Sequence, residues 1–313
     1  MNAYYRQPAI YKDQVVFIAE DDLWTFNLKD KVARRLTANL GMIRYPQFSP
    51  DGKQIAFTST EEGTSEIYIM SSEGGEAKRL TYLGAYLYTL GWKGSKVIFA
   101  SSHSSIFQGF YKLYEIDSEG GAPVELPYGR ARDISFGEKG VVLGRNTGNP
   151  ASWKRYRGGT AGYILIDKNG DGKFKKLIDL KGNFACPMWI GNRIYFICDH
   201  EGIGNIYSCT PEGRDLQKHS NHKDYYARGA YSDGKSIIWH AGAELWLLEI
   251  KENKPRKLSF AYSSPMVQRQ RKFVSPPKNL ENVFLSPDGG SLSLDLRGKA
   301  LVSGNWEGSV QQY

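Results

Sequence analysis

Short apolar triplets recur along the chain, spaced 40 to 53 residues apart. Each triplet is followed by a turn and by a pair that begins with Leu or Ile and usually ends in Tyr or Trp. The triplets occupy residues 15–17, 55–57, 97–99, 141–143, 194–196 and 237–239. Their apolar positions do not follow the 3.6-residue spacing of helices. A period of about 40–45 residues made of four short strands is typical of a β-propeller blade.

The segments between the predicted strands have the composition of tight turns. Residues 49–52 are Ser-Pro-Asp-Gly, and residues 232–234 are Ser-Asp-Gly. Pro presets φ early in such a turn, and Gly accepts the positive φ that follows. We therefore predict an all-β fold, a six-bladed β-propeller of four-stranded antiparallel blades over residues 1–262. Propeller rings commonly close when the N-terminal strand completes the last blade, and residues 4–10 are the segment available for that role.

The composition changes after the sixth repeat. Ser-Ser-Pro and Ser-Pro-Pro runs within residues 263–282 are typical of a linker. The strand and turn pattern then restarts with Leu-Ser-Pro-Asp-Gly at residues 285–289. One blade cannot bury both of its faces alone. We predict that residues 283–313 are the first strands of a second propeller, truncated about half a blade in.

Overall composition agrees with a strand-rich globular protein. The 313 residues include 34 Gly, 14 Phe, 7 Trp and 20 Tyr, which excludes disorder, collagen and coiled coil. The net charge is +8, but Lys and Arg are scattered apart from clusters at residues 154–157 and 269–272. Without a helical stripe or zinc module to present them, nucleic acid is not a predicted partner. The sequence has no apolar run of membrane-spanning length and no visible signal peptide.

Catalytic and metal-binding motifs are absent from the sequence. It has no G-x-S-x-G elbow and no His pair at helical spacing, and the five histidines have no paired acidic motif. We predict no catalytic residue and no cofactor, and a structural role for His240. Cys186, Cys198 and Cys209 lie in apolar stretches and are predicted to be buried free thiols.

One segment resembles the start of a calcium loop. Asp167, Asn169 and Asp171 follow the D-x-N-x-D-G pattern, but Ile178 stands where such a loop needs a bidentate Glu. We therefore predict a β-hairpin turn whose Asx and Gly residues supply local hydrogen bonds. A weak calcium site is the alternative.

Four segments together resemble the N-terminal six-bladed propeller of tricorn proteases. They are residues 153–160 (Trp-Lys-Arg-Tyr-Arg-Gly-Gly-Thr), 193–196, 204–208 and 223–228. Residues 285–298 resemble the first strands of the family's second, seven-bladed propeller. The resemblance implies a large oligomeric peptidase that trims peptides, with propellers acting as channels and sieves. The family's Ser nucleophile and its His belong to C-terminal domains that this sequence lacks, so no catalytic residue is carried over.

Side chains near the beginnings of the innermost strands are predicted to line the channel. Aligned to the turn motifs, they are Arg44, Tyr88, Arg132, Phe184 and Arg228, with Arg155 and Arg157 as further candidates. Arginines around a pore would attract peptide carboxylates through charge-assisted bonds. In the alternative interpretation they pair with acids such as Asp133 and Asp224 and only hold the blades together.

The expected function is that of a non-catalytic propeller in a tricorn-like serine peptidase, guiding or sieving peptides. The expected partners are peptides, the remaining domains of the parent peptidase and other subunits of a homo-oligomer. The family implies a cytoplasmic location, or an exported one if a signal peptide was trimmed. A TolB-like propeller that binds a partner protein is the main alternative. A sugar-acting propeller is disfavoured because Asp boxes and a locatable carboxylate pair are missing.

Overall fold

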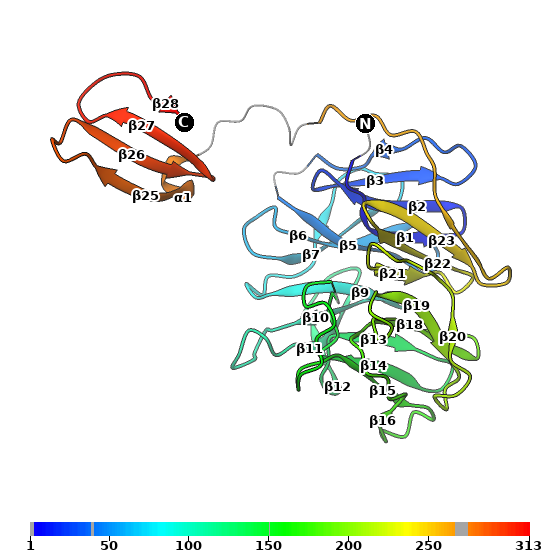
Figure 1. The fold of residues 1–313 in the computed structure, drawn as a ribbon. Helices are drawn as coiled ribbons and strands as arrows, with labels where there is room; N and C mark the ends of the chain where they lie inside the picture. The colour runs from blue at the N-terminus through cyan, green and yellow to red at the C-terminus, as the bar shows by residue number, and fades with distance from the viewer. Residues whose placement is uncertain (1–2, 39–40, 150, 267–274) are drawn as a thin grey trace. The chain divides into compact units, whose positions relative to one another are not determined.

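The structure, a computed structural model, describes residues 3–38, 41–149, 151–266 and 275–313. The described chain forms seven four-stranded antiparallel sheets and one short helix, α1 (Pro276–Asn279). The predicted all-β class and the propeller-like arrangement are confirmed. The chain divides into two compact units, Met1–Ser264 and Pro265–Tyr313 (Figure 1).

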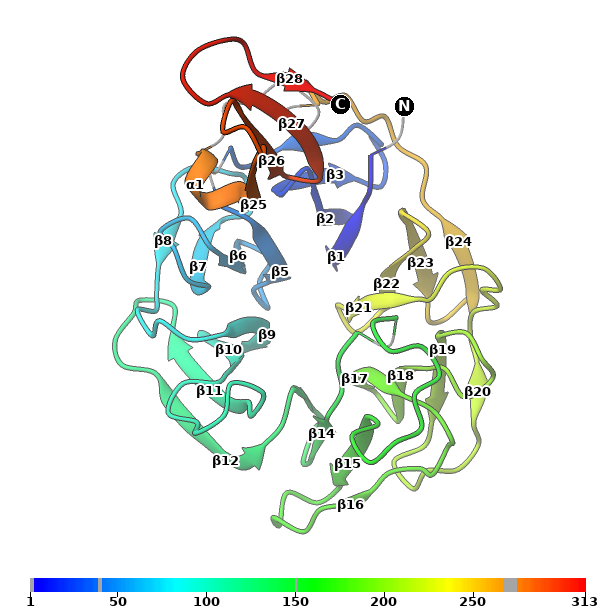
Figure 2. The same ribbon diagram turned by 60° about the vertical axis from the view of Figure 1, so that its left-hand side comes forward.

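The first unit contains six of these sheets, arranged one after another around a central axis (Figure 2). The innermost strands are β1 (Arg6–Tyr11), β5 (Ile43–Phe48), β9 (Leu87–Lys93), β13 (Asp133–Phe136), β17 (Phe184–Ile190) and β21 (Arg228–Ser232). The second strands are β2 (Gln14–Ala19), β6 (Gln54–Ser59), β10 (Lys96–Ser101), β14 (Val141–Arg145), β18 (Arg193–Cys198) and β22 (Ser236–Ala241). The third strands are β3 (Asp22–Asn27), β7 (Glu66–Ser71), β11 (Lys112–Asp117), β15 (Tyr163–Asp167), β19 (Asn205–Cys209) and β23 (Glu244–Glu249). The outer strands are β4 (Arg34–Arg35), β8 (Lys78–Arg79), β12 (Val124–Arg130), β16 (Lys175–Lys176), β20 (Gln217–Lys218) and β24 (Lys254–Lys257).

The apolar core lies between neighbouring sheets. Each recurring triplet lies within a second strand, and Phe17, Phe57, Phe99, Phe196 and Trp239 are fully buried there. The described residues form six apolar clusters, and the buried members of each come from two adjacent sheets. Burial of each such side chain stabilises the fold by about 1.5–3 kcal/mol. The triplets are apolar on both faces because each sheet is covered on both sides.

The ring closes without strand exchange, which corrects the expectation for residues 4–10. Strand β1 pairs with β2 of its own sheet, and the last sheet already has its own outer strand, β24. Closure instead depends on packing and on single hydrogen bonds between the first and last sheets. The Tyr5 N–H donates to the Ala243 carbonyl at 3.2 Å, and a parallel bridge joins Val32 to Ala261.

A polar clasp explains why Thr or Ser follows several outer strands. Thr81 Oγ1 accepts a hydrogen bond from the Ile67 N–H at 2.9 Å and donates to Glu66 at 2.5 Å. Thr37 makes the same two bonds in the first sheet, to Leu23 and Asp22. Most outer strands have only two residues. The backbone hydrogen bonds between the third and outer strands are therefore few, and these hydroxyl groups add to them in holding the outer strand.

The second unit contains a complete four-stranded sheet where about half a blade was expected. Its strands are β25 (Leu280–Leu285), β26 (Ser291–Leu296), β27 (Lys299–Gly304) and β28 (Gln311–Gln312). Val283, Phe284 and Leu285 have exposed fractions of 48%, 64% and 58%, so the apolar side chains of β25 are largely uncovered. Part of the expected linker and the basic cluster at residues 269–272 lie outside the described residues.

Candidate functional site

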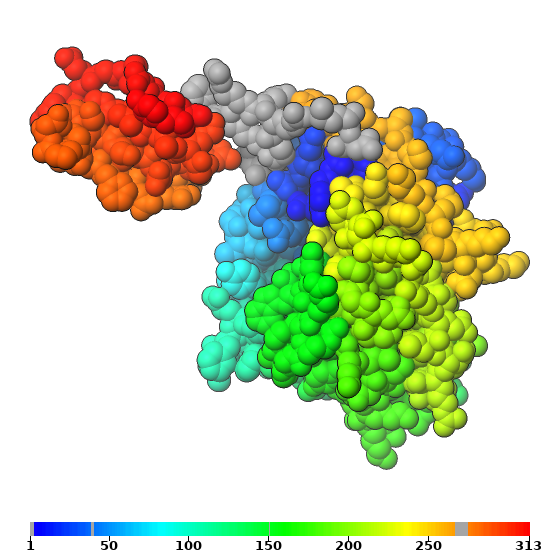
Figure 3. Space-filling model, in the orientation of Figure 1, coloured from blue at the N-terminus to red at the C-terminus, as the bar shows by residue number. Residues whose placement is uncertain are grey.

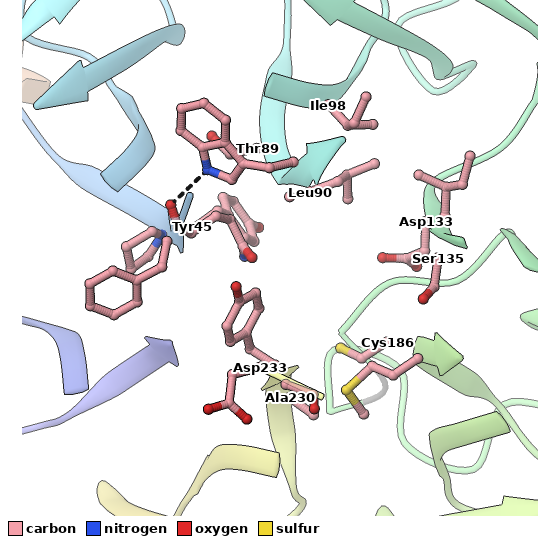
Figure 4. A pocket seen from close by; sticks show the side chains of 18 of the residues that line it. Tyr45, Thr89, Leu90, Ile98, Asp133, Ser135, Cys186, Ala230 and Asp233 are labelled. Atoms are coloured by element: carbon pink, nitrogen blue, oxygen red, sulfur yellow. Dashed lines mark hydrogen bonds between the residues drawn. The ribbon is translucent and has the colours of Figure 1, made fainter. Parts of the chain in front are cut away.

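A cavity lies on the axis of the first unit and is lined by all six innermost strands (Figure 4). Its volume is about 420 Å³. Asp133, Ser135 and Cys186 are among the side chains that point into it, and Tyr45 and Tyr88 also line it. Polar, aromatic and aliphatic side chains, the last including Leu90 and Ile98, thus share the lining.

Irregular backbone shapes this lining. Five of the six innermost strands in the described chain contain a shift of register, and β13 is the regular one. Gln7, Tyr45 and Cys186 lie at three of the shifts with φ of 46°, 53° and 49°. Positive φ in a non-Gly residue costs about 1–3 kcal/mol and concentrates at functional sites. All three residues precede Pro, which is the sequence signal that could have located these bulges.

The strand registers place three of the predicted channel residues, Arg44, Tyr88 and Arg228, at one level around the axis. In each sheet, one residue of the innermost strand pairs with the residue that directly follows the apolar triplet on the second strand. These residues are Arg6, Arg44, Tyr88, Asp133, Ala185 and Arg228. Arg132 precedes this level by one residue. Phe184 does not share the environment of the others. It is 2% exposed in the core between the fourth and fifth sheets, with its ring 5.2 Å from that of Phe196.

Three of the predicted arginines make contacts with groups other than carboxylates. An Arg44 Nη lies 3.6 Å from Met42 Sδ, and the Arg132 guanidinium lies 4.5 Å from the centre of the Tyr111 ring. The Arg228 Nη2 donates to the Tyr4 hydroxyl at 2.9 Å. Among the described residues none of the three forms an ion pair. A direct ion pair with Asp133 or Asp224 therefore does not account for their positions, although Arg132 is close enough to lower the pKa of Asp133 against the larger effect of burial.

Arg155 and Arg157 belong to the loop of residues 153–160, which Asp199 holds in place. The Arg155 N–H donates to Asp199 Oδ2 at 2.9 Å, and the Arg157 guanidinium forms an ion pair with Oδ1 at 3.1 Å. The Asp199 side chain is fully buried. Figure 3 shows the green segment that contains this loop against the yellow-green surface of the following sheet. Arg157 thus anchors the loop, and Trp153 on the same loop is 67% exposed.

The three cysteines are free, as predicted. Cys198 and Cys209 are buried, whereas Cys186 is partly buried on the cavity wall. Burial raises the pKa of Cys186 and of Cys198 to about 12, and that of Cys209 to about 11. All three are therefore neutral thiols at pH 7 and are poor nucleophiles.

The segment that resembles a calcium loop forms a compact turn around Asp167. Its carboxylate accepts hydrogen bonds from the backbone N–H groups of Asn169, Gly170, Asp171 and Gly172, at 2.8–3.2 Å. Burial alone would raise the pKa of Asp167, but the N–H groups directed at both oxygens lower it below the usual value. They therefore stabilise the negative charge of the carboxylate in the absence of a cation. The described residues contain no group of three or more His, Cys, Asp or Glu able to hold a metal.

Calcium is accordingly expected to leave the thermal stability unchanged. The measurement is the melting temperature of the 313-residue chain with millimolar CaCl₂, with MgCl₂ at equal ionic strength as the control. A calcium-specific rise that is lost in Asp171→Asn would establish the alternative, a weak calcium site.

The fold and its axial cavity define a β-propeller domain. A sequence-family profile described as "Tricorn protease N-terminal beta propeller domain" matches residues 2–254. The chain therefore belongs to the tricorn protease family and corresponds to its N-terminal propeller domain. Among the described residues, no helix has the length and hydrophobicity that a membrane crossing requires.

Individual relatives agree with this assignment. The tricorn protease homolog of Saccharolobus solfataricus is 33% identical over 99% of this chain, which spans 29% of that protein. A solved structure, the crystal structure of the tricorn protease, is 32% identical with a TM-score of 0.88, covering 100% of this chain and 31% of that one. A putative tricorn-like protease N-terminal subunit of Sulfurisphaera tokodaii is 31% identical over 53% of this chain and 87% of its own length. This chain thus spans under a third of the first two relatives.

Proposed function

We propose that this chain is the non-catalytic, six-bladed propeller region of a tricorn-like serine peptidase, and that peptides pass through or bind in its axial cavity. The observation that carries the proposal is the set of arginines Arg44, Arg132 and Arg228, which lie near the inner strand ends without a carboxylate partner. A guanidinium that forms no ion pair within the protein can bind a carboxylate in a charge-assisted, potentially bidentate manner. The C-terminus of a peptide supplies that group.

The proposed domain organisation is a propeller over residues 1–262, a linker over 263–282 and the first blade of a second, seven-bladed propeller from residue 283. The turn between β25 and β26 supports this continuation. Ser286 Oγ donates to Asp288 at 2.5 Å and accepts from the Ser291 N–H at 2.9 Å. Ser49 makes the same bonds, to Asp51 and from Gln54, in the second sheet. The same hairpin is thus used in both units.

The partners we propose are the remaining domains of the parent peptidase, further subunits of a homo-oligomer, and peptides. A relative described as an N-terminal subunit supports assembly with a separate chain. We place the protein in the cytoplasm, following the family. One observation favours the alternative of a TolB-like interaction module: Ile106 and Phe107 are 91% and 60% exposed on one loop, as a docking surface requires.

The test compares tetra-alanine with its C-terminal amide by calorimetric titration of the 313-residue chain. We expect the free acid to bind about tenfold more tightly than the amide, because only the acid offers a carboxylate. Arg44→Ala should remove that difference. Arg214→Ala, which changes another exposed arginine outside the innermost strands, is the matched control and should preserve it.

Equal affinities for acid and amide in the wild-type chain would contradict the carboxylate-binding role. Absence of binding by both peptides would favour the TolB-like interaction module, because such a module recognises a folded partner rather than peptide termini. If Arg44→Ala and Arg228→Ala both still bound the free acid more tightly than the amide, other cations of the chain would be responsible for the difference.

A further inference from the structure

Asp133 stands where three other innermost strands carry an arginine at the equivalent register position. It lies on β13, the innermost strand without a shift of register in the described chain, opposite Gly144. At the equivalent positions three other sheets carry Arg6, Arg44 and Arg228. The carboxylate points into the cavity (Figure 4) and forms no ion pair with any described residue. The described lining of the cavity thus contains the carboxylate of Asp133, with that of Asp233 as its second acid and no arginine or lysine.

Aromatic rings accompany this carboxylate. The centres of the Tyr45 and Tyr88 rings are 5.2 Å apart, and Tyr111 continues the group at 5.3 Å from Tyr88. Burial, and to a smaller extent the charge of Asp133, raises the pKa of Tyr45 and of Tyr88, so the acid is close to both phenols. Both tyrosines are neutral at pH 7. Their rings therefore add electron-rich surface but no competing charge to the surroundings of Asp133.

The carboxylate occupies an environment that does not stabilise its charge well. Burial raises the pKa of Asp133, against the lowering effects of the Thr147 hydroxyl and of Arg132. A carboxylate without a cationic partner is costly to bury, and a bound cation would offset that cost. A metal ion is a poor candidate because the described residues offer no cluster of three or more His, Cys, Asp or Glu.

A carboxylate beside tyrosine rings is the combination that recognises an ammonium group, through one ion pair and cation–π contacts. We propose that Asp133, with Tyr45 and Tyr88, binds an ammonium group in the axial cavity, and that the group is the N-terminus of a peptide. This inference rests on the proposed function for the identity of the ligand. It adds recognition of the amino end to the recognition of the carboxylate end by the arginines.

The experiment titrates the 313-residue chain with three probes: tetra-alanine, N-acetyl-tetra-alanine and n-butylammonium chloride. We expect N-acetylation to weaken binding of tetra-alanine about tenfold. Asp133→Asn should weaken binding of the free-amine peptide to the same extent and leave the acetylated peptide unchanged. The matched control is Asp224→Asn, which removes the same charge from an exposed residue and should change neither affinity.

A lysine side chain could supply the same ammonium chemistry. N-acetyl-lysine amide separates the two sources, because it carries only the side-chain ammonium. Asp133-dependent binding of this probe at the affinity of tetra-alanine would overturn the assignment to the peptide N-terminus. Equal binding of tetra-alanine and its acetylated form, or an unchanged affinity in Asp133→Asn, would overturn the ammonium site itself.

Binding of n-butylammonium tests the ammonium site at Asp133 separately from the proposed binding of peptides. If neither peptide binds, the proposed peptide cavity fails, and Asp133-dependent shifts of cavity resonances with n-butylammonium alone still establish the ammonium site. Without those shifts the site fails as well. Tyr45→Leu serves as a second variant and should weaken n-butylammonium binding about threefold or more through loss of the ring. Asp133→Asn is expected to melt no lower than the wild type, because it removes an uncompensated charge.

Discussion

Acidification from pH 7 to pH 4 is expected to lower the free energy of unfolding by about 3 kcal/mol through His240 alone. His240 is 4% exposed on β22 and lies at the junction of the first and last sheets. Its Nδ1 accepts a hydrogen bond from the Gln7 N–H at 3.2 Å, and the Arg228 Nε lies 3.3 Å from its Nε2. The ring thus contributes to closure in its neutral form.

The direction follows from the change in protonation on unfolding. Burial, with smaller contributions from Arg228 and Arg6, lowers the pKa of His240 from 6.5 to about 3. Between these values the unfolded chain binds one proton more than the folded chain, so stability falls as the pH falls. The contribution of His240 is complete above pH 6.5 and is lost progressively down to about pH 3.

Urea unfolding at pH 4, 5, 6 and 7 measures this effect, with His240→Gln as the matched variant. The variant keeps an acceptor for the Gln7 N–H but does not titrate. Carboxylates titrate in both proteins, so the difference between the two pH profiles isolates the histidine. Parallel profiles over the whole range would show that His240 does not govern acid stability.

The repeat of sheets was predictable because each second strand is buried on both faces. That burial demands consecutive apolar residues, as in residues 15–17 and 237–239, which are visible without knowledge of the fold. Ring closure was not predictable in the same way. Strand β24 is Lys-Pro-Arg-Lys and fully exposed, so no apolar signature shows that the last sheet is already complete. The two-residue strand β28 is hidden for the same reason.

The candidate site was predictable only in part. Arg44 and Arg228 follow recognisable turns, and a strand that begins after a turn begins at the rim of the sheet. Phe184 precedes the equivalent position, Ala185, by one residue, and its side chain packs between two sheets. Asp133 was considered only as a partner for arginine. Its place in the cavity depends on the register of β13 and the absence of a bulge there, which one sequence does not reveal.

The other large effect on stability is expected in the second sheet, where Glu66 accepts the hydrogen bond of Thr81. Replacement of Glu66 with Ala should cost about 3–5 kcal/mol of unfolding free energy, because the side chain belongs to a buried ion pair. Glu66 is 1% exposed and lies 3.3 Å from the Arg79 guanidinium. It also accepts from the Thr81 hydroxyl at 2.5 Å and from the Gly84 N–H at 2.9 Å. Truncation leaves all three donors without this acceptor and opens a void beside strand β8.

Glu62 supplies the control on the same arginine. It pairs with Arg79 at 2.6 Å, but its side chain is 58% exposed. Solvent screens such a pair, so Glu62→Ala should cost less than about 1 kcal/mol. Urea unfolding at pH 7 of both variants, with Glu66→Gln as the isosteric comparison, measures the difference. If Glu66→Ala lost no more stability than Glu62→Ala, the outer strand would be held by its backbone ladder and apolar packing, and the buried carboxylate would be dispensable.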